Sequence, residues 1–325
     1  MTTRAMWALV AVSIMALSGL GFYYYATPHP ASVRLGYLLG DIHQLAIPVA
    51  LKNGYFAREG LNVSLVGPFT AGPALMKAFA AGELDVGYVG TPPALTHAAK
   101  GVDIQILASV NSEGSALIVR RGIGRIEDLK GKSIAIPMVG SIQDILLRIA
   151  LLRHGMTYKD LSVLEVRSPD MPAQLEVGRL DGYIAWEPYC AKAVIAGTGN
   201  LLASSGEIWP GHPCCVLVAS RSFIARQPNI VEKIVRVHVR ATRFIQENPN
   251  EAMTIAARFT KLDLQVIAGS WRRILFDYEP KIEETKLFAE RLIEFDVIKK
   301  SDIPDVDKFI TSVYNTDFLK RALAP

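Results

Sequence analysis

The stretch Gly82-Glu-Leu-Asp-Val-Gly-Tyr-Val-Gly-Thr-Pro-Pro-Ala-Leu95 decides the fold class of this chain. Its apolar part, residues 84–89, predicts a short strand that ends at Gly90. Thr91 followed by Pro92 predicts a helix start, because a Thr hydroxyl caps free amides and Pro at the first helical position gives up no needed donor. A strand that turns directly into a helix is typical of an α/β sheet, which binds ligands at the carboxyl ends of its strands.

A second copy of this pattern lies further along the chain, in Gly178-Arg-Leu-Asp-Gly-Tyr-Ile-Ala-Trp-Glu-Pro188. Predicted strands and helices alternate over residues 33–188, which indicates parallel sheets covered by helices on both faces. Residues 111–115 are predicted to interrupt this alternation as a loop. Residues 209–216 are predicted to be a second loop, leading into a strand, and the chain after Phe223 is predicted to be helical.

The composition indicates a globular protein with room for two domains. Of its 325 residues, half are hydrophobic and a fifth are charged. The net charge of +4 is small and the basic residues are dispersed, so no nucleic-acid partner is expected. Arg4 precedes an uncharged, mostly apolar run over residues 5–26, which predicts a signal peptide or an uncleaved membrane anchor within residues 1–31. Either segment would place the remainder outside the cytoplasmic membrane.

Several further motifs occur in a fixed order along the chain. They are Asn53-Gly-Tyr-Phe56, Glu59-Gly-Leu61, Ala81-Gly-Glu-Leu-Asp-Val-Gly87, Ile126-Glu-Asp-Leu-Lys-Gly-Lys-Ser-Ile-Ala-Ile-Pro137 and Leu180-Asp-Gly-Tyr-Ile-Ala-Trp-Glu-Pro188. Each motif is weakly specific, but the ordered set resembles the exported solute-binding proteins of ABC importers, in the nitrate, sulfonate, taurine and thiamine-precursor group. The resemblance covers roughly residues 33–220.

The resemblance implies an α/β, two-lobed fold of the type II periplasmic binding protein class, with a mainly parallel sheet flanked by helices in each lobe and a hinge between the lobes. The first lobe would comprise residues 33–119 plus 217–325 and the second residues 120–216, with crossovers within 116–120 and 216–220. The implied function is an extracytoplasmic receptor that delivers a small polar solute to a membrane permease and its ATPase. Such a receptor is expected to be a monomer without enzymatic activity or a cofactor.

Loops that leave the carboxyl ends of the strands in both lobes are predicted to line the cleft. The predicted ligand-binding residues are Gly40, Asp41, His43, Gly90, Thr91, Ser141, Gln143, Trp186, Glu187 and His212. The positions around five of them, namely Gly40, Thr91, Ser141, Gln143 and Glu187, are carried over from the resemblance.

A structural interpretation stands beside several of these functional ones. Asp41 and His43 could be a helix cap and a solvated histidine, and Thr91 is a cap first. Trp186 could be a core aromatic residue. A salt bridge across the lobes would suit Glu187 as well as a ligand does.

The cysteines depart from the pattern of the family. Cys214 and Cys215 could be small buried residues, because adjacent cysteine side chains usually cannot both face one partner. Alternatively, they join His212, His43 and Asp41 in a site for a soft metal or a metal complex. A disulfide between Cys190 and either neighbour is a third possibility in an oxidising compartment.

The predicted cleft loops contain carboxylates and histidines but no Lys or Arg, whereas a sulfonate or nitrate site would profit from a fixed cation. This balance favours a nitrogen heterocycle or an amine as the solute, although helix starts also bind anions unaided. The rival function is an enzyme of the same fold, similar to those of thiamine-pyrimidine or menaquinone biosynthesis. The export segment argues against it, because those pathways are cytoplasmic. A membrane-tethered sensor domain is a third hypothesis.

Overall fold

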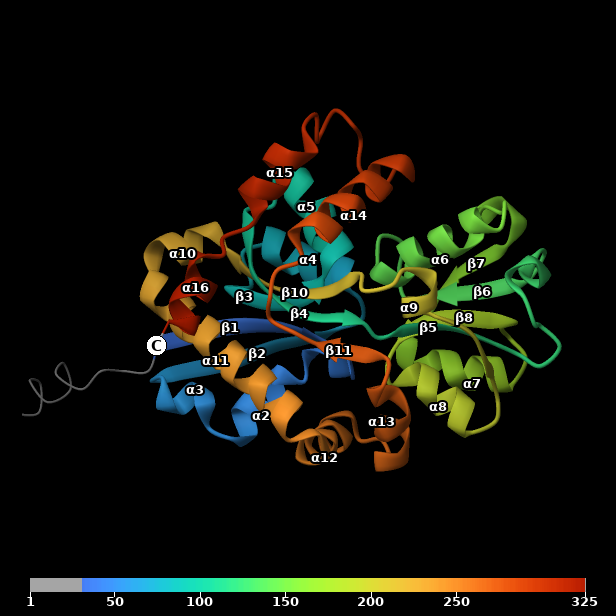
Figure 1. The fold of residues 1–325 in the computed structure, drawn as a ribbon, viewed down its shortest axis with the longest axis horizontal. Coiled ribbons are helices and arrows are strands. Elements are labelled where there is room, and N and C mark those ends of the chain that lie inside the picture. Colours follow the sequence, from blue (N-terminus) through green and yellow to red (C-terminus); the bar gives the residue numbers. More distant parts are fainter. Residues whose placement is uncertain (1–30, 325) are drawn as a thin grey trace, which may run out of the picture.

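The structure, a computed structural model, describes residues 31–324 and contains two β-sheets covered by helices (Figure 1). The strand order is β11-β4-β10-β3-β1-β2 in the larger sheet and β7-β6-β8-β5-β9 in the smaller. The predicted signal or anchor segment lies outside the described residues, apart from Ala31. Within residues 31–324, no helix has both the length and the apolar character that crossing a bilayer requires.

The strands of the larger sheet are β1 (Ala31–Leu38), β2 (Leu61–Phe69), β3 (Val86–Gly90), β4 (Ile104–Glu113), β10 (Pro213–Ser220) and β11 (Ile274–Phe276). Those of the smaller sheet are β5 (Ser115–Val119), β6 (Ser133–Ile136), β7 (Ser162–Glu165), β8 (Gly182–Trp186) and β9 (Asn200–Ser204). The larger sheet lies between α4 and α5 on one face and α2, α3 and α11 on the other (Figure 1). The smaller sheet lies between α6 and the pair α7 and α8.

The α-helices are α2 (Ala46–Lys52), α3 (Tyr55–Arg58), α4 (Gly72–Ala80), α5 (Thr91–Ala99), α6 (Ile142–Arg153), α7 (Met171–Glu176), α8 (Tyr189–Ile195), α9 (Ser205–Ile208), α10 (Arg221–Arg226), α11 (Pro228–Glu247), α12 (Pro249–Thr260), α13 (Leu264–Trp271), α14 (Ile282–Glu294), α15 (Val306–Val313) and α16 (Asp317–Leu323). The 3-10 helices are η1 (Ile42–Gln44), η2 (Ile126–Leu129), η3 (Tyr158–Asp160) and η4 (Ser168–Asp170).

The strand-to-helix turn predicted at residues 84–95 is present, since β3 ends at Gly90 and α5 begins at Thr91. Its echo is present too, with β8 ending at Trp186 and α8 beginning at Tyr189. The predicted Thr91 cap is wrong. Thr91 occupies the first helical position, and its hydroxyl donates a hydrogen bond of 3.1 Å to the carbonyl of Cys214 on β10.

The two-lobed α/β fold class is as expected, but the sheets are mixed rather than mainly parallel. Three of the five strand pairings in the larger sheet are antiparallel, and so are two of the four in the smaller. Every antiparallel pair contains at least one of the three strands β4, β5 and β10, and these strands carry the chain between the sheets. Residues on these long strands alternate too little in polarity to indicate their direction, because both faces are buried.

The chain crosses between the sheets earlier than the sequence indicated. The predicted loop at residues 111–115 is wrong, because β4 continues to Glu113 and β5 begins at Ser115, with Gly114 between them. The chain returns to the larger sheet at Pro213, so the predicted loop at 209–216 is partly strand. The C-terminal part also contains the strand β11, which short length and flanking helices concealed.

Helix α11 covers one face of the larger sheet and packs against α2 and α16. Pro228 occupies its first turn, where no intrahelical donor is needed. Val231, Ile234, His238 and Ala241 recur at helical spacing and are buried, so the apolar stripe faces the protein interior.

His238 connects this helix to two strands of the larger sheet. Its Nε2 donates a hydrogen bond of 2.7 Å to the carbonyl of Ser109, and its Nδ1 accepts one of 3.1 Å from the Tyr88 hydroxyl. Burial lowers the pKa of His238 to about 4, so the folded protein holds this ring neutral.

This depressed pKa predicts a loss of stability at acidic pH. Below about pH 6.5 the unfolded chain binds a proton at His238, whereas the folded chain binds it only near pH 4. This difference in pKa corresponds to about 3 kcal/mol of unfolding free energy. The stabilisation is complete above pH 6.5 and is lost as the pH falls towards 4. We expect the unfolding free energy, measured with urea at pH 7, 5.5 and 4, to fall less steeply in His238→Gln than in the wild type. Equal slopes for the two proteins would refute this role of His238.

Candidate functional site

A small cavity lies where β1, β3 and β8 end, between the two sheets. Its volume of about 20 Å³ has room for about one water. Its walls are formed by Leu38, Asp41, His43, Gly72, Gly90, Pro93, Ser141, Ile142, Gln143, Trp186, Cys214 and Cys215. Of the ten predicted ligand-binding residues, this wall includes Asp41, His43, Gly90, Ser141, Gln143 and Trp186.

Two helices begin at the cavity, α5 from the larger sheet and α6 from the smaller, and the free amides at such starts attract negative partial charge. Ser141 caps α6, since its Oγ accepts a hydrogen bond of 3.3 Å from the amide of Asp144. The Asp144 carboxylate accepts a hydrogen bond of 2.7 Å from the amide of Gly140, which precedes the cap. The start of α5 offers fewer donors, because Pro92 and Pro93 have no N–H.

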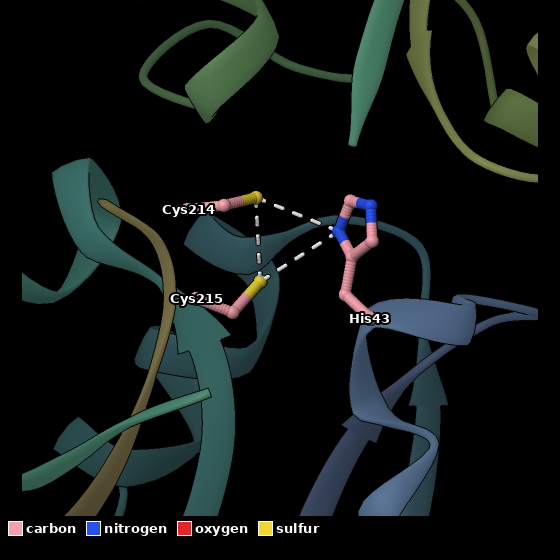
Figure 2. A group of neighbouring side chains, drawn as sticks. All are labelled: His43, Cys214 and Cys215. Carbon is pink, nitrogen blue, oxygen red and sulfur yellow. Dashed lines mark hydrogen bonds between the residues drawn. The ribbon is translucent and has the colours of Figure 1, made fainter. Parts of the chain in front are cut away.

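His43, Cys214 and Cys215 face one another on one side of the cavity (Figure 2). His43 Nδ1 lies 3.5 Å from Cys214 Sγ and 3.9 Å from Cys215 Sγ, and the two sulfur atoms are 3.8 Å apart. Asp41 Oδ1 lies 3.3 Å from the same nitrogen. All four side chains are buried.

The expectation that two adjacent cysteines cannot face one partner is wrong here. Successive side chains of a regular strand point to opposite faces. The register of β10 against β4 shifts between Pro213 and Cys215 and again between Cys215 and Val216. Such an irregularity bends the strand and redirects its side chains, so both sulfur atoms point towards His43.

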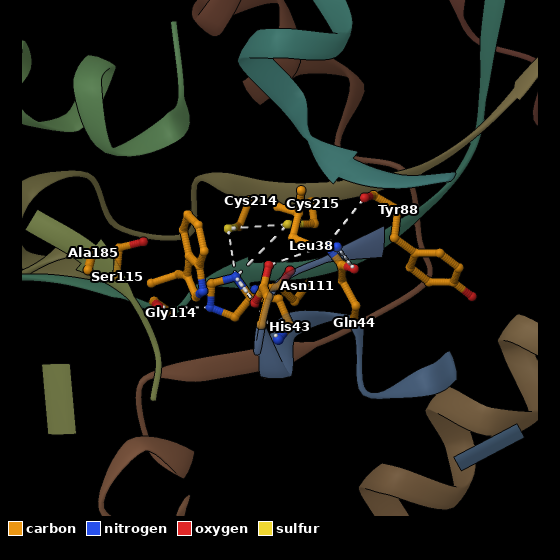
Figure 3. Close-up of polar contacts among 12 residues, drawn as sticks. Leu38, His43, Gln44, Tyr88, Asn111, Gly114, Ser115, Ala185, Cys214 and Cys215 are labelled. Atoms are coloured by element: carbon orange, nitrogen blue, oxygen red, sulfur yellow. Dashed lines mark hydrogen bonds and ion pairs between the residues drawn. The ribbon is translucent and has the colours of Figure 1, made fainter. Parts of the chain in front are cut away.

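The turn that carries His43 is fixed by Gln44. The Gln44 Oε1 atom accepts a hydrogen bond of 2.9 Å from the amide of Leu38, and its Nε2 donates one of 3.2 Å to the carbonyl of Tyr88 (Figure 3). The Asp41 carboxylate accepts from the amide of His43 at 2.9 Å. These bonds anchor η1 to the ends of β1 and β3.

The carbonyl of Gly114 joins the two halves of the site. It accepts a hydrogen bond of 2.8 Å from His43 Nε2, on the larger sheet, and one of 2.9 Å from the amide of Glu187, at the end of β8. Gly114 adopts a φ of +92°, and a Cβ atom there would lie 2.2 Å from His43 Nε2. The position therefore requires glycine.

The charges of this cluster are strongly coupled. Burial raises the pKa of Asp41 to about 6. Burial alone would lower the pKa of His43, but the charges of Asp41 and Cys214 outweigh it and raise that pKa to about 10. Burial also opposes ionisation of Cys214, yet its contacts with Cys215 and His43 hold the pKa of its thiol well below the usual range. The pKa of Cys215 is raised, by the hydrogen bond with Cys214 and by burial.

Two polar side chains from the smaller sheet complete the wall. The indole Nε1 of Trp186 is buried and has no hydrogen-bond partner among the described residues, although the side chain is only 2% exposed. Gln143, in the first turn of α6, donates a hydrogen bond of 2.9 Å from Nε2 to the Ser115 hydroxyl.

Four predicted ligand-binding residues lie off the cavity wall. Gly40 adjoins the hydroxyl of Tyr189, and Thr91 bonds to β10 as described above. Glu187 is buried and forms an ion pair with Arg273, which is the salt bridge that was expected as the alternative to ligand binding. Its carboxylate also accepts a hydrogen bond from the amide of Ala191.

His212 and Cys190 are occupied elsewhere as well. His212 Nδ1 donates a hydrogen bond of 2.7 Å to the carbonyl of Trp209, and the ring lies edge-on to Phe288. All three cysteines are free. Cys190 donates to the carbonyl of Ala185 at 3.1 Å, so the structure contradicts a disulfide involving it.

Comparison with known proteins identifies the family. The NMT1-like family matches residues 26–260. The chain belongs to the NMT1-like family. A protein of Brucella abortus named only as a binding protein is 31% identical over 236 residues, which cover 71% of this chain and 72% of that protein. The taurine-binding periplasmic protein of Escherichia coli is 27% identical, over 66% of this chain and 67% of its own length.

Solved structures show the same fold. The alkanesulfonate-binding protein SsuA of Xanthomonas axonopodis pv. citri, solved with bound MOPS, superposes with a TM-score of 0.77 at 20% identity. The alignment covers 89% of this chain and all of that one. The fold of this NMT1-like protein is therefore that of a periplasmic binding protein.

Sequence reasoning missed several wall residues of this NMT1-like protein. They are Leu38, Gly72 and Pro93. Each lies next to a turn that the sequence did indicate, but apolar residues and glycine carry no chemical signal of a site. The Gly114 carbonyl was also missed, since a backbone acceptor cannot be recognised without the fold.

Substitution of Gly114 tests how the site is held in this NMT1-like protein. Gly114→Ala should lower the unfolding free energy by about 1–3 kcal/mol more than Gly101→Ala, because the new methyl group displaces the His43 ring from its buried acceptor. Gly101 is the matched control, since it also has a positive φ, of +86°, but no atom within 4 Å of its Cβ position. Urea unfolding measures both losses, and equal losses would contradict the proposed packing of His43 on Gly114.

Proposed function

We propose that this protein is an extracytoplasmic solute-binding receptor of an ABC importer, which captures a small polar solute between its sheets and delivers it to a membrane permease and ATPase. Family membership and the similarity to a taurine-binding periplasmic protein support the class. The observation that carries the proposal is the cavity itself, which lies at the strand ends of both sheets and is lined by Trp186, whose buried Nε1 has no partner among the described residues.

Solute entry requires the lobes to separate. A cavity of about 20 Å³ cannot admit a solute of several heavy atoms, so the described conformation corresponds to a closed cleft. In this proposal the lobes follow the sheets, with residues 31–113 and 213–324 in one and 115–204 in the other. The hinge then lies at Gly114 and in the segment that precedes Pro213, where the chain crosses.

The cavity wall favours a solute that carries both an acceptor and a donor. Trp186 Nε1 lacks an acceptor among the described residues, whereas Asp41 and Cys214 offer a carboxylate and a sulfur atom as acceptors on the same wall. No Lys or Arg of the described chain lines the cavity, so a simple oxyanion would meet no fixed cationic side chain other than His43. A nitrogen heterocycle or an amine-bearing solute such as taurine meets both requirements.

A ligand panel tests the class and the chemistry together. Taurine, ethanesulfonate, nitrate and 4-aminopyrimidine are each added to the purified protein, and the melting temperature is measured. Taurine and ethanesulfonate differ by the amine, so a larger shift with taurine or aminopyrimidine would support a solute with a donor. No shift with any compound would contradict the receptor proposal, and larger shifts with ethanesulfonate and nitrate would contradict the preference for a donor.

Trp186→Phe separates binding from folding. The substitution keeps an aromatic ring and removes the unpartnered donor, so solute affinity should fall about 5- to 10-fold, the effect of one lost hydrogen bond. The unfolding free energy without solute should not fall for lack of a hydrogen bond, because Nε1 makes none in the described structure. The matched control is Trp271→Phe, because Trp271 packs on Phe276 and does not line the cavity. Isothermal titration with the most stabilising panel compound measures both, and unchanged affinity in Trp186→Phe would refute the contact.

A further inference from the structure

One group of side chains in the described chain has ligand atoms that all lie within 4.8 Å of one another: His43, Cys214 and Cys215. We propose that these three residues bind one Zn²⁺ ion on the cavity wall and leave its fourth coordination position to the solute. The metal site stands on its own geometry; only the identity of the fourth ligand rests on the proposed function.

The distances between the three ligand atoms match a tetrahedral zinc site. With Zn–S bonds of about 2.3 Å and Zn–N bonds of about 2.0–2.1 Å, a tetrahedron has S···S edges of about 3.8 Å and N···S edges of about 3.5 Å. The observed separations are 3.8 Å between the sulfur atoms, and 3.5 and 3.9 Å from His43 Nδ1 to Cys214 and Cys215. An ion could be held with shifts of a few tenths of an ångström.

The donor set selects the metal. Two thiolates and an imidazole in tetrahedral arrangement suit Zn²⁺, whereas Mg²⁺ and Ca²⁺ prefer oxygen ligands. On coordination, two Zn–S bonds and one Zn–N bond form, and the protons held by the cluster pass to solvent. No redox change is required.

The second coordination shell is already present. A zinc-ligating histidine usually donates its other ring N–H to a carbonyl or carboxylate, which fixes the tautomer and the ring plane. His43 Nε2 donates to the carbonyl of Gly114 at 2.8 Å, so Nδ1 is the ring nitrogen that faces the two sulfur atoms and would bind the metal once it has lost its proton (Figure 3). The irregular register of β10 brings both sulfur atoms to this side of the strand.

The fourth position opens to the cavity. Asp41 does not belong to the mutually close group, nor does His212, whose Nδ1 bonds to Trp209. All three ligands line the cavity together with Trp186. A water would complete the tetrahedron in the absence of solute, and a heterocycle or amine nitrogen would replace it, since such nitrogen atoms are good zinc ligands.

Cobalt substitution tests the metal site directly. The purified, reduced protein is titrated with Co²⁺ and then with Zn²⁺ while the absorption spectrum is recorded. We expect one Co²⁺ per chain, thiolate-to-cobalt charge-transfer absorption, intense visible bands of a tetrahedral ion, and their loss when Zn²⁺ displaces the cobalt. Cys214→Ser, Cys215→Ser and His43→Gln should each remove stoichiometric binding.

Two further variants make the test specific. Cys190→Ser is the control, because Cys190 is a buried cysteine that bonds to Ala185 and lies outside the group. Gly114→Ala should weaken Zn²⁺ binding about 10- to 100-fold by disturbing the second shell. The proposal is overturned if the wild type shows no charge-transfer band, or if the band survives in Cys214→Ser and Cys215→Ser.

Wild-type protein alone provides an independent measurement in case the variants fold poorly. X-ray absorption at the zinc edge should show two sulfur and at least one nitrogen neighbour, and a shell of oxygen and nitrogen only would refute the site. Solute-induced melting shifts, measured for the metal-free and for the zinc-loaded protein, distinguish the two proposals. Solute binding without any zinc binding defeats this inference alone, whereas zinc binding without any solute response defeats the receptor function.

Discussion

The site depends on one backbone carbonyl, that of Gly114. Its oxygen has two lone pairs, and it accepts from the imidazole of His43 on the larger sheet and from the amide of Glu187 on the smaller. It lies at the residue where the chain crosses from β4 to β5, so the crossover, the orientation of His43 and the edge of the cavity are fixed at one point. Any side chain at this position would meet the imidazole ring.

Local signals predicted much of this arrangement from the sequence. The turn from β3 into α5 follows from residue types with strong positional preferences, and it leads to the cavity. The bounds and direction of the buried strands β4 and β10 were harder to predict. A strand covered on both faces shows no alternation of apolar and polar residues, and its direction depends on partner strands far along the chain. The shared orientation of Cys214 and Cys215 depends on the register of β10 against β4, which no local pattern records.

The fold alone does not specify what the cleft binds, since one fold carries many functions. Two relatives of this NMT1-like protein are named for binding and for taurine, and its fold matches that of an alkanesulfonate-binding protein. What this chain adds is the wall itself: Trp186 of one lobe, whose buried indole N–H has no partner among the described residues, lines the same cavity as two thiols and an imidazole from the other. The described wall residues include no Lys or Arg.

The most direct test of this account is a crystal structure of the protein grown with the panel compound that stabilises it most. The account predicts electron density for the solute between Trp186 and the cluster of His43, Cys214 and Cys215, in contact with the start of α6. It also predicts that the cavity is wider there than its present volume of about 20 Å³. Solute density elsewhere on the molecule, with this cavity unchanged, would contradict the account.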